Sequence, residues 1–123
     1  MKKIDAHSHI GNFGGWAKVK IDIDKLIKQM DEYEIEKVIL CGTGSHDNEN
    51  VANAYTKYKE RVLPIVYTNP CEGKDAVEKI YNYVNRKNFR GIKLNPLKDA
   101  YVADSEILDP IMEAAEELNI PVF

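Results

Sequence analysis

Two histidines near the start of the chain carry the clearest chemical signal. They lie in the segment Ile4-Asp5-Ala6-His7-Ser8-His9. If this segment is a strand, its side chains alternate between two faces, so His7 and His9 point the same way, about 6.7 Å apart along the strand. Two imidazoles at the carboxyl end of a strand can converge on one metal ion, at N–metal distances near 2.1 Å. We expect His7 and His9 to be metal ligands. The alternative is a polar pair on an exposed strand.

Asp5 and Trp16 are candidates to support this site from the same part of the chain. The same alternation places Asp5 on the face of the two histidines, one step deeper. Its carboxylate could orient a ligand or help close the floor of the fold. Trp16 ends the glycine-rich segment 11–16, which we expect to be a long loop. Trp16 and Phe13 could cover a ligand or simply pack against the rim.

A second group of candidates lies in the segment Gly91-Ile92-Lys93-Leu94-Asn95-Pro96. Lys93 and Asn95 share a face if this segment is a strand. A lysine inside an apolar strand needs a partner, because an unpaired charge is costly to bury. That partner could be a substrate, a metal-bridging modification of the lysine, or a neighbouring acid such as Asp5.

Strand-like and helix-like segments alternate along the chain and must position these residues. Short runs rich in β-branched residues predict strands, and apolar residues at helical spacing predict helices between them. The predicted strands are residues 3–10, 37–41, 62–67, 90–94 and 120–123. The predicted helices begin at Asp22 or Asp24, at Asp47 or Asn48, at Gly73, and at Asp109 followed by Pro110.

This alternation indicates an α/β fold with parallel strands and right-handed crossovers. Strands begin near residues 4, 37, 62, 90 and 120, a mean spacing of about 29 residues. Eight such units need about 232 residues, close to the roughly 250 of a (β/α)8 barrel. We therefore expect residues 1–123 to form a single (β/α)4 half of a TIM barrel plus the start of a fifth parallel strand. A flavodoxin-like sheet of five parallel strands is the alternative.

Composition excludes several other classes of protein. The 123 residues include 44% hydrophobic and 30% charged residues, with a net charge of −3. The basic residues are scattered among acidic ones, so we expect no nucleic-acid partner. No apolar run suits a signal peptide or a membrane span, so no membrane contact and a cytoplasmic location are expected. Two cysteines, Cys41 and Cys71, are too few for a disulfide framework.

Taken together in their order and spacing, several segments resemble the amidohydrolase superfamily, in particular its amidohydrolase-2 group. The resemblance implies a TIM barrel that binds a divalent metal, usually zinc, with His7 and His9 as the ligands of the first strand. The metal would polarise a carbonyl or activate a water molecule. The resemblance rests on residues 4–10, 30–33 with 37–39, 61–64, 68–70, 90–96 and 114–122.

The same resemblance predicts an incomplete active site. Asn95 occupies a position where many family members have histidine, and the family's later ligands and base would fall after Phe123. We expect little activity from the chain alone, weak or absent metal binding in isolation, and self-association as a homodimer or higher oligomer that closes the barrel. Two alternatives are a metal hydrolase completed by a second chain and a flavodoxin-like binding module without metal.

Overall fold

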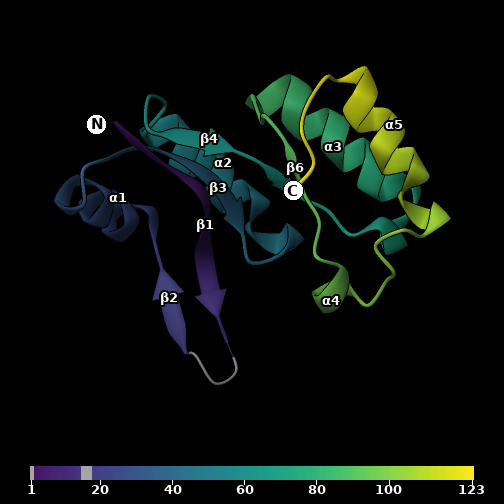
Figure 1. Cartoon of the computed structure of the whole chain (residues 1–123), viewed down its shortest axis with the longest axis horizontal. Coiled ribbons are helices and arrows are strands. Elements are labelled where there is room, and N and C mark those ends of the chain that lie inside the picture. Colours follow the sequence, from purple (N-terminus) through teal and green to yellow (C-terminus); the bar gives the residue numbers. More distant parts are fainter. Residues whose placement is uncertain (1, 15–17) are drawn as a thin grey trace.

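The computed structural model describes residues 2–14 and 18–123, and it has the predicted alternation of strands and helices (Figure 1). Trp16 lies outside the described residues. The strands are β1 (Lys3–Phe13), β2 (Val19–Ile21), β3 (Ile35–Gly42), β4 (Val62–Pro64), β5 (Val66–Tyr67) and β6 (Ile92–Lys93). The α-helices are α1 (Ile23–Glu32), α2 (Asn48–Lys57), α3 (Lys74–Lys87), α4 (Pro96–Asp99) and α5 (Asp109–Glu117). Short 3₁₀ turns cover Ser45–Asp47, Pro70–Glu72 and Glu106–Leu108.

The parallel strands follow one another across the fold in chain order. β1 pairs with β3, β3 with β4, and β5 with β6. β4 and β5 form one extended segment, since Ile65 between them donates its N–H to the Leu40 carbonyl at 2.9 Å. In a flavodoxin-like sheet the first strand would lie between the second and third. Here β1 pairs instead with β3 and with the hairpin strand β2, so that alternative does not describe this fold.

The predicted fifth strand at residues 120–123 is reduced to a single parallel bridge, between Ile92 and Val122. Backbone hydrogen bonds from Phe123 to the Ile92 carbonyl and from Leu94 to the Phe123 carbonyl, of 2.8 and 2.9 Å, hold it beside β6. The end of the chain therefore lies next to β6, as Figure 1 shows.

The prediction of a long loop after the first strand is wrong for the residues that the structure describes. β1 continues through Gly11 and Asn12 to Phe13 and pairs antiparallel with β2, with Gly11 opposite Ile21. The glycine-rich segment thus begins as one arm of a hairpin that extends away from the sheet (Figure 1). Gly11 has a φ of +131°, a conformation that side-chain-bearing residues rarely adopt.

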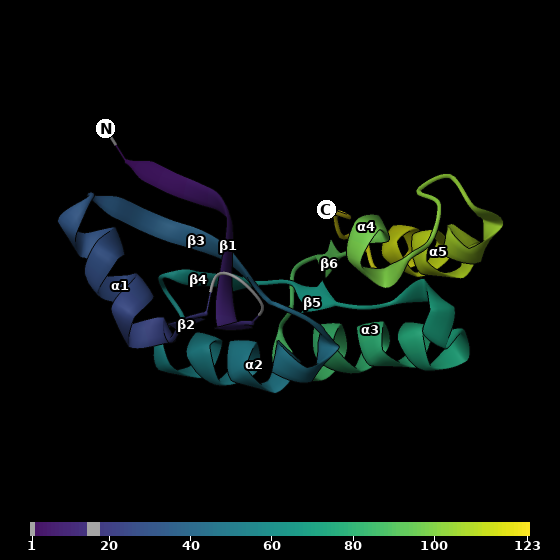
Figure 2. The same cartoon turned by 90° about the horizontal axis from the view of Figure 1, so that it is seen from below.

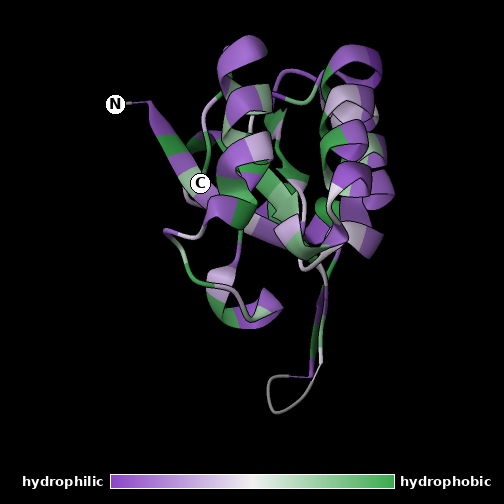
Figure 3. Ribbon diagram, turned by 90° about the vertical axis from the view of Figure 1, so that its right-hand side faces the viewer, coloured by the Kyte–Doolittle hydropathy of each residue, from purple (hydrophilic) through white to green (hydrophobic). Residues whose placement is uncertain are grey.

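The core lies between the strands and the helices. α2 and α3 lie along one side of the strands in Figure 2, and α5 packs against α3. Hydrophilic and hydrophobic residues alternate along the helices in the colouring of Figure 3, and the buried residues among them are mostly apolar. This amphipathic pattern is the one that made the helices predictable from sequence. Fully buried core residues include Leu40, Ile80, Phe89 and Ile92.

No helix among the described residues combines the length and the apolar character needed to cross a membrane. The predicted cytoplasmic location stays a prediction. Cys41 and Cys71 are both free thiols, the first buried and the second exposed.

Candidate metal centre

A register shift in β1 sets the geometry of the site. Asp5 pairs with Val38 of β3, and Ser8 pairs with Leu40, so Ala6 and His7 of β1 lie opposite the single residue Ile39 of β3. Such an irregularity is a β-bulge, which re-aims the side chains around it. It is located at Ala6 and His7, within the predicted metal motif.

The bulge brings the two predicted ligands together. The rings of His7 and His9 have centroids 4.7 Å apart and are tilted by 51°. Both histidines lie in the middle of β1, close to Ile10, where its parallel pairing with β3 ends. A third potential donor, Cys41 of β3, joins them, and one ligand atom from each of the three lies within 4.8 Å of the others. His7, His9 and Cys41 could therefore hold a metal ion, and the cysteine is a residue that the sequence did not single out for this role.

Hydrogen bonding defines the protonation of the His9 ring. Its Nδ1 lies 2.9 Å from the carbonyl oxygen of Gly42. A carbonyl oxygen can only accept, so this contact requires the proton on Nδ1. The Nε2 atom then carries the free lone pair and can bind a metal, an arrangement common among metal-binding histidines.

Partial burial and nearby charges lower the pKa of His7 and so favour its neutral form. Partial burial of the ring, the Lys93 ammonium and the His9 ring all lower the pKa of His7, and Asp5 opposes them. A neutral imidazole is the form that binds a metal. Burial raises the pKa of the Cys41 thiol to about 12, against the opposing effect of Lys93. In the absence of metal, the sulfur therefore carries its proton at neutral pH.

Asp5 binds the His7 backbone and the Ser8 side chain rather than, as the sequence predicted, sharing the face of the two histidines. Asp5 pairs with Val38, and His9 pairs with Cys41. Because Val38 and Cys41 are an odd number of residues apart on β3, their side chains face opposite sides of that strand. The expectation that Asp5 shares the face of His7 and His9 is wrong, because the bulge interrupts the alternation. The Asp5 carboxylate instead accepts hydrogen bonds from the His7 backbone N–H at 3.0 Å and the Ser8 hydroxyl at 2.6 Å. It stabilises the bulge that places the histidines.

Lys93 and Asn95 take separate positions. Lys93 lies near enough to His7 and Cys41 for its charge to lower the pKa of His7 and to oppose the rise that burial causes in the pKa of Cys41. Within the described part of the chain, no carboxylate oxygen lies within 4.0 Å of its ammonium, so the suggested pairing with Asp5 is absent. β6 ends at Lys93, and Asn95 instead caps α4 by accepting from the backbone N–H of Lys98 at 3.2 Å.

A cavity of about 500 Å³ opens beside His9 at the carboxyl ends of the parallel strands. Phe13 contributes to its wall, with its ring edge-on to the His9 ring at 5.9 Å. Lys98 also faces this cavity. It donates to the Thr43 carbonyl, and its ammonium lies 5.1 Å from the centre of the Tyr67 ring. None of the described residues that line the cavity is acidic: they are His9, Asn12, Phe13, Gly14, Thr43, His46, Tyr67, Asn95 and Lys98.

Asp47 organises the loop that forms one wall of this cavity, whereas the sequence predicted only that a helix begins at Asp47 or Asn48. Its side chain accepts from the Thr43 backbone N–H at 3.1 Å, the Thr43 hydroxyl at 2.6 Å and the Asn50 amide at 3.1 Å. Burial opposes its ionisation, but these hydrogen bonds and the nearby His46 outweigh it and lower the pKa of Asp47. Asp47 therefore holds the loop through a buried carboxylate.

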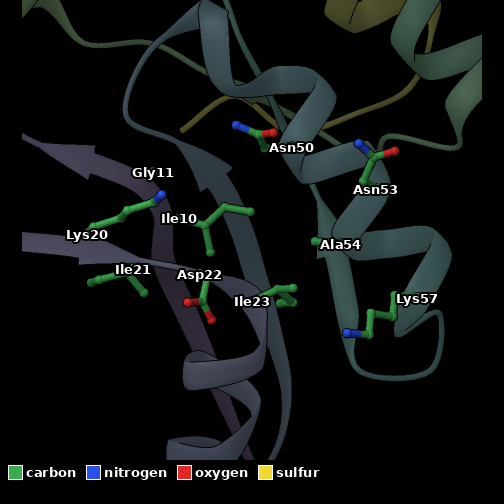
Figure 4. A pocket seen from close by; sticks show the side chains of 10 residues that line it. All are labelled: Ile10, Gly11, Lys20, Ile21, Asp22, Ile23, Asn50, Asn53, Ala54 and Lys57. Atoms are coloured by element: carbon green, nitrogen blue, oxygen red, sulfur yellow. The ribbon is translucent and has the colours of Figure 1, made fainter.

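A second cavity, of about 370 Å³, lies away from the histidine pair between the hairpin and α2 (Figure 4). Ile10, Ile21, Ile23 and Ala54 supply apolar surface there, and Lys57 lies at its edge. The ammonium of Lys57 is already paired with Asp24 at 2.7 Å. Among the residues that the structure describes, no group of potential metal ligands lies at this cavity.

Fold and site together define the class of protein: an α/β chain with parallel strands in sequential order and potential metal ligands at their carboxyl ends. The sequence model of the family described as Amidohydrolase (Amidohydro_2) matches residues 4–123. The chain belongs to this family, as the resemblance predicted. No curated protein sequence matches it.

Solved structures share this fold at low sequence identity. A 5-carboxyvanillate decarboxylase from Novosphingobium aromaticivorans, in complex with manganese and a nitrobenzoic acid, has a TM-score of 0.84 at 17% identity, over 98% of this chain and 49% of that one. A 2,6-dihydroxybenzoate decarboxylase from Rhizobium has a TM-score of 0.75 at 21% identity, with 98% and 48% covered. A 4-oxalomesaconate hydratase from Rhodopseudomonas palustris has a TM-score of 0.75 at 17% identity, with 98% and 51% covered. The chain thus spans about half the length of these enzymes.

Proposed function

We propose that this chain is the first half of an amidohydrolase-type barrel and contributes the first-strand ligands, His7 and His9, of a divalent metal site. The observation that carries the proposal is the pair of imidazoles, 4.7 Å apart, beside a cavity at the carboxyl ends of parallel strands. In barrels of parallel strands, active sites lie at this end. The fit of the donors supports it as well, because the hydrogen bond to Gly42 leaves Nε2 of His9 free.

Zinc is the metal that we propose for this site. Imidazole suits zinc and several other transition metals, whereas manganese favours carboxylate and carbonyl oxygens. Neither of the two imidazoles is joined by a carboxylate ligand from the described residues, and the third potential donor is a sulfur. The N. aromaticivorans enzyme holds manganese. The proposal therefore predicts a metal preference different from that of this relative.

The cavity favours a small organic acid as substrate. Its described lining has two aromatic side chains, Phe13 and Tyr67, and the cation Lys98, without an acidic residue. Lys98 would attract a carboxylate, while the aromatic rings would contact a planar group. A bound metal would polarise a carbonyl or carboxylate, or supply a hydroxide near neutral pH. Decarboxylation, hydration and hydrolysis of such an acid are the reaction types in keeping with the relatives, which include decarboxylases of aromatic acids and a hydratase.

Residues 1–123 would supply only about half of such a barrel. The chain covers only 49% of the carboxyvanillate decarboxylase. Two copies would supply the number of βα units in one such enzyme, so we propose that isolated chains associate as homodimers. Ile4, 60% exposed, and Phe123, 39% exposed, leave apolar surface on the strands for this contact. We expect little catalysis from this assembly, since both copies repeat the same first half.

Metal content tests the proposed site. Purified protein is incubated with zinc, dialysed, and assayed for bound metal by mass spectrometry, alongside a His7→Ala variant. His46→Ala is the matched control, because His46 has an exposed ring paired with Asp47 rather than with the other histidines. One zinc per chain in the wild type and the control, with loss in His7→Ala, supports the proposal. Equal zinc in all three proteins refutes it.

Native mass tests the association. Light scattering at several concentrations should give a mass near twice that of the 14.0 kDa chain. A monomer at every concentration would refute the dimer. Co-expression with the second half of an amidohydrolase of this family tests the alternative, completion by another chain: a stable one-to-one complex with zinc-dependent activity would favour it over the homodimer.

A further inference from the structure

We propose that Asp47 is a positioning residue for the metal site, because it holds one end of the peptide unit whose other end binds the ring of His9. This peptide unit joins Gly42 and Thr43, where β3 ends. The inference rests on the proposed function, in which His9 binds the metal through Nε2. Asp47 lies outside the group of potential metal ligands described above, so its role is separate from ligation.

Both ends of the peptide unit between Gly42 and Thr43 are hydrogen-bonded to side chains. The carbonyl oxygen, which belongs to Gly42, accepts from Nδ1 of His9 at 2.9 Å. The N–H, which belongs to Thr43, donates to Oδ2 of Asp47 at 3.1 Å. Because a peptide unit is planar, a carboxylate that fixes its N–H also fixes the direction of its carbonyl oxygen. Asp47 and His9 are therefore connected through a single rigid group.

Further contacts hold the Asp47 carboxylate in place. It also accepts from the Thr43 hydroxyl at 2.6 Å and from the Asn50 side-chain amide at 3.1 Å. The Nε2 atom of His46 lies 3.4 Å from the same carboxylate. Asp47 is buried, so water has little access to these partners. The carboxylate can therefore act as a fixed point for the peptide that it binds.

Two glycines let the Asp47 side chain approach the strands closely. A Cβ at Gly42 would clash with the Asp47 Cβ, and a Cβ at Gly11 would clash with the Asp47 carboxylate. Gly42 lies in β3, and Gly11 lies in β1 two residues after His9. Asp47 thus packs directly against the backbone of both strands next to His9.

The consequence for a metal is the direction of the Nε2 lone pair of His9. The hydrogen bond from Nδ1 sets both the tautomer and the orientation of the ring, so Nε2 is held ready for the metal. Without Asp47, the peptide after Gly42 would lose the partner of its N–H and could turn. The carbonyl oxygen would then hold the His9 ring less firmly, and the ring would have to be reoriented when metal binds.

Zinc titration of four proteins tests this role: the wild type, Asp47→Ala, Asp47→Asn and Asn48→Ala. Asn48 is the matched control, because it is buried and bonds to Tyr67 through two hydrogen bonds of 2.9 Å. Its loss should destabilise the fold without removing a partner of the Gly42–Thr43 peptide. Any general effect of lower stability on zinc binding should therefore be the same in Asn48→Ala and Asp47→Ala.

The expected order of zinc affinities follows from the hydrogen bond to the peptide N–H. Support from outside the ligand set is typically worth 10- to 100-fold in metal affinity, so we expect Asp47→Ala to bind zinc about tenfold more weakly. Asp47→Asn should recover most of this loss, because its side-chain oxygen can still accept from the Thr43 N–H. Asn48→Ala should match the wild type. Wild-type affinity in folded Asp47→Ala, equal losses in Asp47→Ala and Asn48→Ala, or no recovery in Asp47→Asn would overturn the proposal.

Nitrogen-15 NMR of the metal-free protein gives a readout that a merely structural role would not move. The wild type should show His9 protonated at Nδ1 and slow hydrogen exchange at the Thr43 amide. Asp47→Ala should show a mixture of His9 tautomers, and Asn48→Ala should keep the wild-type one. A His9 proton at Nε2 or a rapidly exchanging Thr43 amide in the wild type would contradict the proposal, even if no variant folds. Unchanged zinc binding in His7→Ala would refute the proposed metal site instead, so the two failures are distinguishable.

Discussion

Replacement of Asp47 by alanine should destabilise the fold through the loss of one buried carboxylate. Asp47 is 5% exposed and accepts three hydrogen bonds, two from Thr43 and one from Asn50. A hydrogen bond to a charged group contributes about 1.5–3 kcal/mol, but water can reach the half-buried Thr43 and replace part of that loss. Counting about 1 kcal/mol for each bond, we expect the free energy of unfolding to fall by about 3 kcal/mol.

Urea unfolding followed by circular dichroism, at one fixed protein concentration, measures this loss. Asp104→Ala is the control, because Asp104 is an exposed aspartate outside the helices and strands. Its unfolding free energy should change by less than about 0.5 kcal/mol. If Asp47→Ala is as stable as this control, the carboxylate does not hold the loop, and our account of the cavity wall is wrong.

Three further predictions concern the same edge of the sheet. The pKa of Asp47 is lower in the folded state, so its carboxylate stabilises the fold above the unfolded-state pKa, and this contribution is lost as the pH falls through the folded-state pKa. Asp47→Asn should therefore flatten the acid side of a plot of unfolding free energy against pH. Parallel curves for the variant and the wild type would contradict this. The fully buried Asn48 side chain donates a hydrogen bond to the Tyr67 carbonyl oxygen and accepts one from the Tyr67 backbone N–H, both at 2.9 Å. Asn48→Ala should therefore lower the free energy of unfolding, measured in urea, by about 2–4 kcal/mol. A loss below about 1 kcal/mol would refute the role of this bridge. In Gly11→Ala the new Cβ would clash with the Asp47 carboxylate at a φ of +131°, so the melting temperature of this variant should fall by several degrees. Gly14→Ala, whose Cβ would have no atom of the described residues within 4 Å, should melt like the wild type, and equal melting temperatures for the two variants would refute the strain.

Local patterns in the sequence were sufficient for the alternation of the main strands and helices and for the family, whereas β2 and α4 were not predicted. Helical spacing of apolar residues located α1, α2, α3 and α5 to within a few residues, because each helix buries one face against the strands. The His7 and His9 pair was visible for a similar reason, since both residues belong to one strand. The strand lengths were less accurate: β6 and the bridge at Val122 are shorter than predicted, and β1 is longer.

Contacts between distant residues decided the rest of the site. The bulge in β1 reversed the face of Asp5, and it follows from the register with β3 rather than from the sequence of β1 alone. Cys41 lies 32 positions after His9 and meets it only because the two strands are adjacent. Strand alternation describes a single strand, whereas pairing and register depend on how the whole sheet packs. The sequence by itself therefore determined the family and the alternation of the main strands and helices, and it singled out the two histidines, whereas the tertiary structure decided which residues surround them.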